Sequence, residues 1–172
     1  MKTSVLSLLA LAVPGVFCSL RTSTPSGCLT VKATGASSTE YSSLSDAITS
    51  LGTGSSSSTA CIFLYAGSYN EQVVVKSYQG ALTIYGYTND SSSYANNQVT
   101  ITHSENSTVA GSDEASSTVD SRLNNFKMYN INVVNSFVGS QAIAFTSNGN
   151  QQSFYGCAFY GYQGAFTRDP SF

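Results

Sequence analysis

Few side chains of this sequence can carry chemistry by themselves. Histidine occurs once, as His103, between Thr102 and Ser104 at the end of an apolar run. One histidine and four cysteines do not favour a zinc site with several ligands. No cysteine or serine with a neighbouring base accompanies His103, so nucleophilic catalysis of that kind is not indicated. We interpret His103 as a hydrogen-bonded surface or ladder residue.

The carboxylates are also few. Seven Lys and Arg stand against nine Asp and Glu. We interpret Glu71 as a structural carboxylate that ties down a turn rather than as a catalytic group. Asp113 and Glu114 form an acidic cluster in the polar stretch 106–120. We expect this stretch to be a solvated loop.

The composition limits the class of protein. Charged residues make up 9% of the 172 residues, against roughly 25% in an average soluble protein. The net charge of −2 excludes a basic nucleic-acid-binding surface as a leading interpretation. Eleven tyrosines and nine phenylalanines argue against disorder. Such a composition suits a secreted β-rich protein that handles neutral or acidic sugars. We expect no cofactor, no nucleic-acid or membrane partner, and a monomer.

The first residues have the layout of a signal peptide. A basic start precedes the apolar run 5–13, which is too short to span a bilayer. Cys18 invites a lipoprotein interpretation, but Phe17 before it is bulky where such a signal requires a small residue. We therefore predict a signal peptide at 1–19, a single domain at 20–172, and secretion to the extracellular space.

Secretion makes the cysteines informative. Cys28 and Cys61 each begin an apolar strand and form the natural disulfide. Cys157 is then either a buried free thiol or the partner of a cysteine beyond residue 172. Sequons for glycosylation begin at Asn89 and Asn106.

Hydrophobic periodicity predicts one helix and many strands. Apolar residues fall on one helical face across 43–51, with Ser43 as N-cap and Gly52 after the end. The other apolar runs are rich in β-branched and aromatic residues, and Gly, Asn or Ser clusters separate them. We predict strands at 61–65, 72–76, 82–87, 99–103, 126–134, 142–146 and 154–159.

Several of these strands share one local pattern. The segments 84–87, 128–131 and 154–157 look like one unit, with 44 residues between the first two and 26 between the next two. Coils of roughly 22–26 residues, with one unseen coil in the first gap, fit a parallel β-helix. The rival is a β-sandwich, but no Asn-Gly or Asp-Gly turn joins two of these strands directly. The predicted helix would cover an open end of the solenoid. The asparagines expected to stack as ladders are Asn130, Asn132 and Asn135.

Six sequence blocks follow one another between Pro25 and Gln163. They are the G-x-Y-x-E-x-V block at 67–73, the strands at 82–87 and 99–104, the segments 126–132 and 139–144, and the segment 151–157 with the Gly-Tyr-Gln of 161–163. In order and spacing these blocks resemble the fungal pectin methylesterases. The resemblance implies a right-handed parallel β-helix. It also implies hydrolysis of the methyl esters of galacturonan to pectate and methanol, with pectin as the partner.

The same resemblance assigns site residues. Hydrolysing a methyl ester without a metal or a Ser–His pair needs a carboxylate nucleophile, a second carboxyl group as acid/base, and donors for the oxyanion. In the family two glutamines donate to the oxyanion, two aspartates act as acid/base and nucleophile, and an arginine orients the nucleophile. By motif, Gln141 and Gln163 take the oxyanion positions; without the resemblance, either would be an ordinary ladder residue. Tyr160 and Tyr162 either stack on sugar faces or pack in the core.

The sequence departs from the family directly after Gln163. The family reads Gln-Asp-Thr-Leu here, whereas this chain reads Gln-Gly-Ala-Phe at 163–166. Gly164 therefore stands where the acid/base aspartate is expected, and the later coils with the nucleophile and the arginine are missing. We expect a truncated, inactive β-helix that arises from a frame change or a mis-spliced gene, and we assign no role to Arg168 or Asp169. The alternative is a non-catalytic polysaccharide-binding or structural β-helix.

Overall fold

Three sheets of parallel strands surround one core. The computed structural model describes residues 20–168. The first sheet contains, in spatial order, β1 (Leu29–Val31), β2 (Thr59–Leu64), β5 (Ala81–Gly86), β8 (Phe126–Tyr129) and β11 (Ser153–Tyr155). The second contains β3 (Gly67–Asn70), β6 (Val99–His103), β9 (Asn132–Asn135) and β12 (Ala158–Tyr160). The third contains β4 (Val73–Val75), β7 (Val119–Ser121), β10 (Phe145–Ser147) and β13 (Phe166–Arg168).

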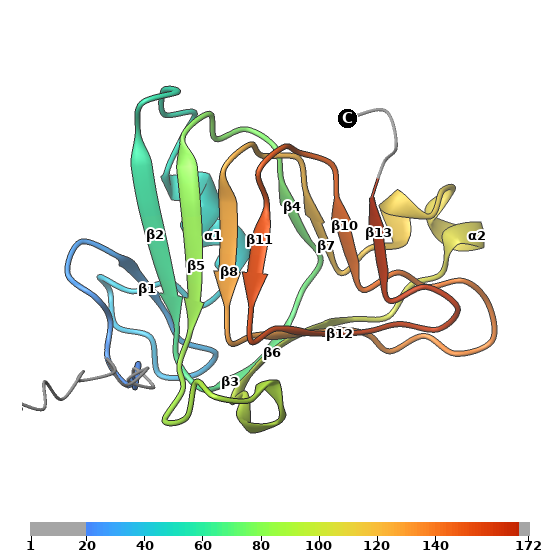
Figure 1. The fold of residues 1–172 in the computed structure, drawn as a ribbon, viewed down its shortest axis with the longest axis horizontal. Coiled ribbons are helices and arrows are strands. Elements are labelled where there is room, and N and C mark those ends of the chain that lie inside the picture. The colour runs from blue at the N-terminus through green and yellow to red at the C-terminus, as the bar shows by residue number, and fades with distance from the viewer. Residues whose placement is uncertain (1–19, 169–172) are drawn as a thin grey trace, which may run out of the picture.

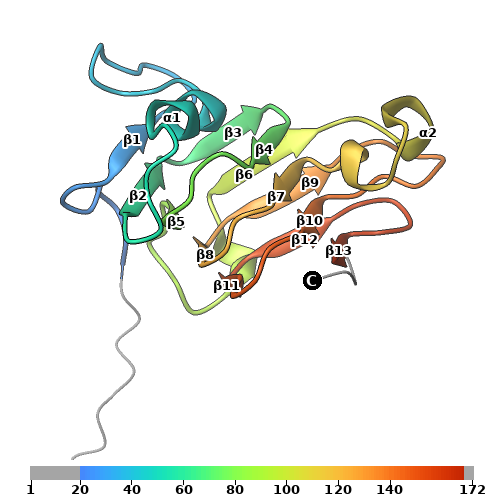
Figure 2. The same cartoon turned by 90° about the horizontal axis from the view of Figure 1, so that it is seen from above.

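Consecutive strands belong to different sheets, so each passage through the three sheets makes one coil. β5, β6 and β7 form one coil, and β8, β9 and β10 pair with them in the same order. Figures 1 and 2 show the coils following one another along the long axis. The prediction of an all-β, right-handed parallel β-helix is confirmed. The rival β-sandwich is excluded, because its hairpins would require antiparallel pairs.

The inward positions of the first sheet hold a row of apolar side chains. Ile62, Ile84 and Met128 occupy equivalent positions on three strands, and each is completely buried. Phe154 continues the row on β11. Complete burial of one such side chain contributes about 1.5–3 kcal/mol. A shift of one residue in register would turn this row outward, so the core specifies how the coils align.

Two of the predicted strands are divided by sharp bends. The sequence predicted continuous strands at 126–134 and 154–159, but Asn130 separates β8 from β9 and Gly156 separates β11 from β12. Asn130 has φ 54° and Gly156 has φ 59°, in the left-handed region that asparagine and glycine tolerate best. The strands on both sides of each bend pack against the same core. The alternation of apolar residues therefore continues across the bend, and the sequence pattern does not reveal the bend.

Of the three asparagines expected to stack in ladders from coil to coil, Asn132 contacts an asparagine of the preceding coil. Nδ2 of Asn97 donates to Oδ1 of Asn132 at 3.0 Å, whereas Oδ1 of Asn130 accepts from Arg21 at 3.3 Å. Asn135 instead binds carbonyl groups of loops. Each of the three expected ladder members therefore has a different partner.

The coil of β5, β6 and β7 is longer than the sequence predicted. Leu82 pairs directly with Phe126, so the prediction of an unseen coil between them is wrong. The additional residues form two loops. One contains η1 (Tyr94–Asn96), and the other contains α2 (Ser107–Ala110) and η2 (Glu114–Ser116). Loops at the bends of a solenoid can lengthen a coil without changing the strand register, and a constant period therefore fails to predict them.

Tyrosines form a stacked row on the outer face of the first sheet. Tyr85, Tyr129 and Tyr155 occupy equivalent positions, with successive ring centroids 5.2 and 4.6 Å apart. The Arg21 guanidinium lies 4.6 Å from the Tyr85 centroid, and two backbone hydrogen bonds join Arg21 to Thr88. The beginning of the described chain is thereby attached to the outside of the solenoid.

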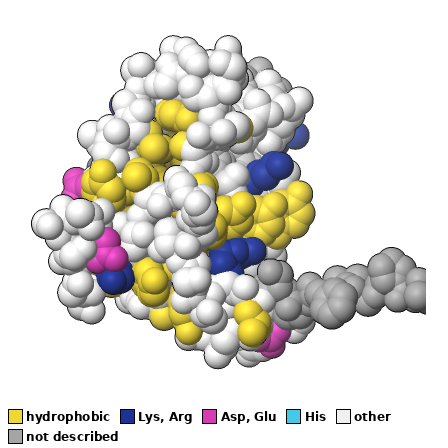
Figure 3. Space-filling model, turned by 90° about the vertical axis from the view of Figure 1, so that its left-hand side faces the viewer, with side chains coloured by type: hydrophobic (Ala, Val, Ile, Leu, Met, Phe, Trp, Pro, Cys, Tyr) yellow, Lys and Arg dark blue, Asp and Glu magenta, His cyan; other side chains and the backbone are white. Residues whose placement is uncertain are grey.

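A short helix covers the first end of the solenoid. α1 (Leu44–Ser50) begins at the predicted N-cap Ser43, whose Oγ accepts from the Asp46 amide at 3.1 Å. Leu44 and Ala47 are completely buried, and the helix contacts β1 and β4. Figure 3 views the molecule from this end and shows hydrophobic side chains in separate patches among polar ones. The prediction of a capping helix is therefore confirmed.

One disulfide lies near the same end. Cys28 and Cys61 form it, and it links the residue before β1 to β2. No helix within residues 20–168 is long and apolar enough to cross a membrane. The predicted signal peptide at 1–19, with Cys18, lies outside the described residues.

Candidate active site

The predicted site residues stand on two neighbouring coils. Gln141 precedes β10 and Gln163 precedes β13, and these two strands pair in parallel. The pairing extends toward the site, because the Ala142 amide donates to the Tyr162 carbonyl at 2.9 Å. The two segments that carry the predicted oxyanion donors are therefore adjacent.

Gln141 is held by a loop of the preceding coil. Its Nε2 donates to Oδ2 of Asp113 at 2.7 Å, and its backbone carbonyl accepts from the Ser107 amide at 2.9 Å. The expectation of a purely solvated loop is wrong for Asp113, because the loop contacts the segment before β10 in the next coil. Sequence analysis missed Asp113 as a member of this site.

Gly164 lies beside Gln141 and Ile143. A Cβ atom added at Gly164 would lie 3.9 Å from Nε2 of Gln141 and 2.6 Å from Cδ1 of Ile143. The second contact is with the far end of a flexible side chain, which can move. A side chain at position 164 would therefore begin next to the Gln141 amide once the end of the Ile143 side chain has moved.

Gln163 itself is exposed and has an unusual backbone conformation. Its φ of 61° lies in the left-handed region, which side chains other than Asn, Asp and Gly seldom adopt. Such a conformation persists only where the surroundings hold it, and it turns the chain sharply before β13. The oxyanion roles of Gln141 and Gln163 stay predictions.

The two tyrosines before Gln163 both face solvent. Tyr160 is 50% exposed and Tyr162 is 40% exposed. Rings this exposed do not pack in the core, which was the other interpretation of these residues. Both rings are accessible to a ligand from solution, and contact with a sugar stays a prediction.

The other polar residues singled out from the sequence have local partners. Nε2 of His103 lies 3.5 Å from Oε2 of Glu105 at the end of β6. The Glu71 carboxylate accepts from the backbone amides of Leu44 and Ser45, at 2.8 and 3.0 Å, and so holds the first turn of α1. These contacts agree with structural roles for both residues.

The thiol of Cys157 is shielded. It donates to the Met128 carbonyl at 3.4 Å, and burial raises the pKa of Cys157 to about 11. A thiol with this pKa is almost entirely protonated at neutral pH, so it is a poor nucleophile.

The two sequon asparagines differ in accessibility. Asn89 is exposed, and its Oδ1 accepts from Nε2 of Gln98 at 2.8 Å. Asn106 is 8% exposed, and its Oδ1 accepts from the Val109 amide at 2.8 Å as the N-cap of α2. Glycosylation at either position stays a prediction, and Asn89 offers the more accessible side chain.

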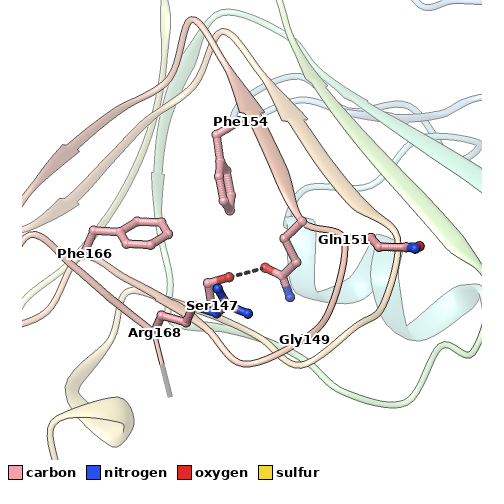
Figure 4. Close-up of a pocket in the computed structure, with 7 residues that line it drawn as sticks. Ser147, Gly149, Gln151, Phe154, Phe166 and Arg168 are labelled. Atoms are coloured by element: carbon pink, nitrogen blue, oxygen red, sulfur yellow. Dashed lines mark hydrogen bonds between the residues drawn. The ribbon is translucent and has the colours of Figure 1, made fainter. Parts of the chain in front are cut away.

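A cavity of about 320 Å³ lies at the end of the solenoid that β11 and β13 form, and neither Gln141 nor Gly164 lines it. Figure 4 shows Phe154 and Phe166 on two sides of it and Ser147 at its base, where the Ser147 hydroxyl donates to Oε1 of Gln152 at 2.9 Å. The inner faces of β10, β11 and β13 supply most of this lining. The cavity is therefore the end of the core rather than a preformed substrate site.

Comparison with known proteins gives one consistent result. The family model described as Pectinesterase matches residues 29–168. Pectinesterase A of Emericella nidulans is 52% identical over 144 residues, which are 83% of this chain and 42% of that protein. The pectinesterase of Aspergillus aculeatus is 39% identical over 166 residues, which are 95% of this chain and 49% of that protein. The chain thus spans about half the length of the relatives it matches.

Solved structures agree with these relatives. The crystal structure of the pectin methylesterase from Aspergillus niger in deglycosylated form superposes with a TM-score of 0.75 at 46% identity, covering 87% of this chain and 50% of that one. The pectin methylesterase from carrot superposes with a TM-score of 0.69 at 26% identity, covering 84% of this chain and 43% of that one. The boundary after residue 19 and the end of the family-like sequence near Gln163 stay predictions.

Proposed function

The chain belongs to the pectinesterase family, and on that premise we propose that the protein it comes from hydrolyses the methyl esters of galacturonan, giving pectate and methanol. The observation that carries this proposal is the placement of Gln141 beside position 164 on neighbouring coils. Pectin is then the partner, and no cofactor takes part. The catalytic groups are side chains.

The residues support an esterase mechanism in the following way. A carboxylate attacks the ester carbonyl carbon, and a carboxyl group at position 164 protonates the departing methanol, which leaves an acyl-enzyme. The group at position 164, now a carboxylate, takes a proton from the water that hydrolyses the acyl-enzyme, and this step releases pectate and regenerates the nucleophile. The amides of Gln141 and Gln163 donate to the oxyanion that forms on the carbonyl oxygen. Neutral amides suit this role because they stabilise the oxyanion without neutralising the nearby carboxylates. By resemblance, the nucleophilic aspartate and its arginine belong to coils that follow this stretch.

We also propose that the 172-residue chain is inactive by itself. Gly164 has no proton to transfer, and this position is where the family carries its acid/base aspartate. The second candidate function, binding of polysaccharide without hydrolysis, is favoured by the exposed rings of Tyr160 and Tyr162. Retention on a pectin column without methanol release would support that function over the esterase.

Export of the protein to the extracellular space is the third part of the proposal. The disulfide between Cys28 and Cys61 supports it, because disulfides persist mainly in oxidising compartments. The apolar run at 5–13 supports it independently. Secretion of the chain from a fungal host, with a new N-terminus after residue 19, would test both.

Methanol release from esterified pectin is the decisive measurement. We expect none from the 172-residue chain and none after Gly164→Asp alone. We expect turnover once Gly164→Asp is combined with the downstream coils of a relative. In that protein Gln141→Ala and Gln163→Ala should each lower turnover by about 10²–10³-fold, the usual effect of removing one oxyanion donor. Full activity with both glutamines replaced would show that the oxyanion assignment is wrong.

A further inference from the structure

The two ends of a glutamine carboxamide are similar in size but opposite in hydrogen bonding. The oxygen accepts and the NH₂ group donates, so a 180° turn of the amide exchanges a donor for an acceptor. An oxyanion site needs the donor. Something near Gln141 must therefore fix which end of its amide faces the neighbouring coil.

The Asp113 carboxylate is suited to fix that orientation. An ionised carboxylate only accepts hydrogen bonds, so it bonds Nε2 of Gln141 and rejects the amide oxygen. The distance of 2.7 Å between Nε2 and Oδ2 is that of a charge-assisted hydrogen bond. One N–H of Gln141 is used in this way. Nε2 itself lies 3.9 Å from where a Cβ at position 164 would stand, and its second N–H can donate to a further acceptor.

The turn that carries Asp113 is itself attached to the segment between Gln141 and β10. The Ser116 hydroxyl donates to the Asp113 carbonyl at 2.7 Å and accepts from the Ile143 amide at 3.3 Å. Ser116 is completely buried. Nδ2 of Asn135 also donates to the carbonyls of Ser116 and Ile143, at 2.8 and 3.0 Å. These contacts hold the Asp113 backbone in a fixed position relative to Gln141.

From this geometry we propose that Asp113 is a positioning residue, which holds the Gln141 amide with its NH₂ group turned toward position 164. The inference rests on the proposed esterase function for its purpose, but the orientation itself is a property of this chain. Asp113 touches no reacting atom and acts only through Gln141. A carboxylate at position 113 can only accept, so it fixes the orientation of the Gln141 amide. An asparagine there would not fix it, because an asparagine amide can bond either end of the glutamine amide.

Nuclear magnetic resonance of the Gln141 side-chain amide tests the proposal without any activity assay. In the 172-residue chain, we expect the two Nε2 protons of Gln141 to be separated by more than those of the exposed glutamines, because one of them is bonded to a carboxylate. Asp113→Asn should reduce this separation toward the ordinary value, while the backbone amide of Ile143 keeps its position. Glu114→Gln is the matched control, because it removes a neighbouring charge without touching Gln141. Unchanged Gln141 signals in Asp113→Asn would overturn the proposal.

A swap of the two side chains provides a second test that needs only a melting temperature. Gln141→Glu places two carboxylates against each other and should lower Tm. Adding Asp113→Asn should recover much of that loss, because the new amide can donate to the new carboxylate. If the double variant melts no higher than Gln141→Glu alone, the two side chains do not interact as proposed. Neither result bears on the esterase proposal, which the methanol assay tests separately.

Discussion

The two ends of the solenoid differ in how their last layer of side chains is covered. At the first end, α1 lies against β1 and β4, and Leu44 is completely buried. At the other end, Phe166 is 43% exposed, and the cavity of Figure 4 opens beside Phe154. A helix of about two turns is therefore enough to cover the first layer of the core, whereas within residues 20–168 no element covers the rings of Phe154 and Phe166.

The largest expected effect comes from the aromatic cluster just inside the uncovered end. The Phe145 ring is completely buried and contacts the rings of Phe126, Phe154, Phe159 and Phe166. Phe145→Ala should lower the free energy of unfolding by about 3–5 kcal/mol. Phe166→Ala should have a smaller effect, because its ring is partly in water already. Urea unfolding followed by far-UV circular dichroism measures the free energy of unfolding of both variants. Equal losses in the two variants would contradict the expectation that the buried ring contributes more than the partly exposed one.

Removing the disulfide should weaken the covered end next most strongly. The bridge between Cys28 and Cys61 spans a sequence separation of 33 residues. Replacing both cysteines with serine should cost about 2–4 kcal/mol, mainly because the unfolded chain gains freedom. Thermal melting of the double variant against the parent chain is the measurement. Cys157→Ser, which breaks no bridge, is the control.

A smaller loss is expected when the cap of α1 is weakened. Glu71→Gln removes the charge that accepts from the Leu44 and Ser45 amides. Hydrogen bonds to charged groups contribute about 1.5–3 kcal/mol, and the remaining amide oxygen keeps part of this. We expect a loss near the lower limit in chemical unfolding. Glu114→Gln, an acid away from the helix, should change stability less, and an equal change would show that Glu71 has no special role.

The smallest effect concerns a partly exposed ion pair at the covered end. A hydrogen bond from Lys32 lowers the pKa of Glu40 from 4.5 to about 2. A carboxyl group with a lowered pKa stabilises the fold above its unfolded pKa, and this contribution is lost as the pH falls from 4.5 toward 2. Glu40→Gln should therefore flatten the loss of stability over that acid range. Thermal melts of the parent chain and of Glu40→Gln at several pH values test this expectation. An identical pH dependence of Tm in both proteins would contradict a contribution of the Lys32–Glu40 pair.

The sequence predicted features that depend on neighbouring residues, and it did not predict features that depend on contacts between coils. α1 was predicted closely because its cap, its apolar face and its stop signal are all local. The bends at Asn130 and Gly156 were not, because an apolar pattern facing one core does not change at a bend. The contact between Asp113 and Gln141 joins residues on different coils and depends on a folded loop. β7 pairs with β10, with Val119 opposite Phe145. Knowledge of this register would have predicted that the loop before β7, with Asp113, lies near the segment before β10, with Gln141.

The stacked tyrosines give the molecule an optical property. The chain contains no tryptophan, so its near-ultraviolet signal comes mainly from tyrosine. Tyr129 and Tyr155 belong to successive coils, and their rings lie 12° from parallel. Electronic transitions of rings stacked in this way couple only while the coils are in contact. Near-UV circular dichroism of this row therefore reports the docking of one coil on the next, without any added label.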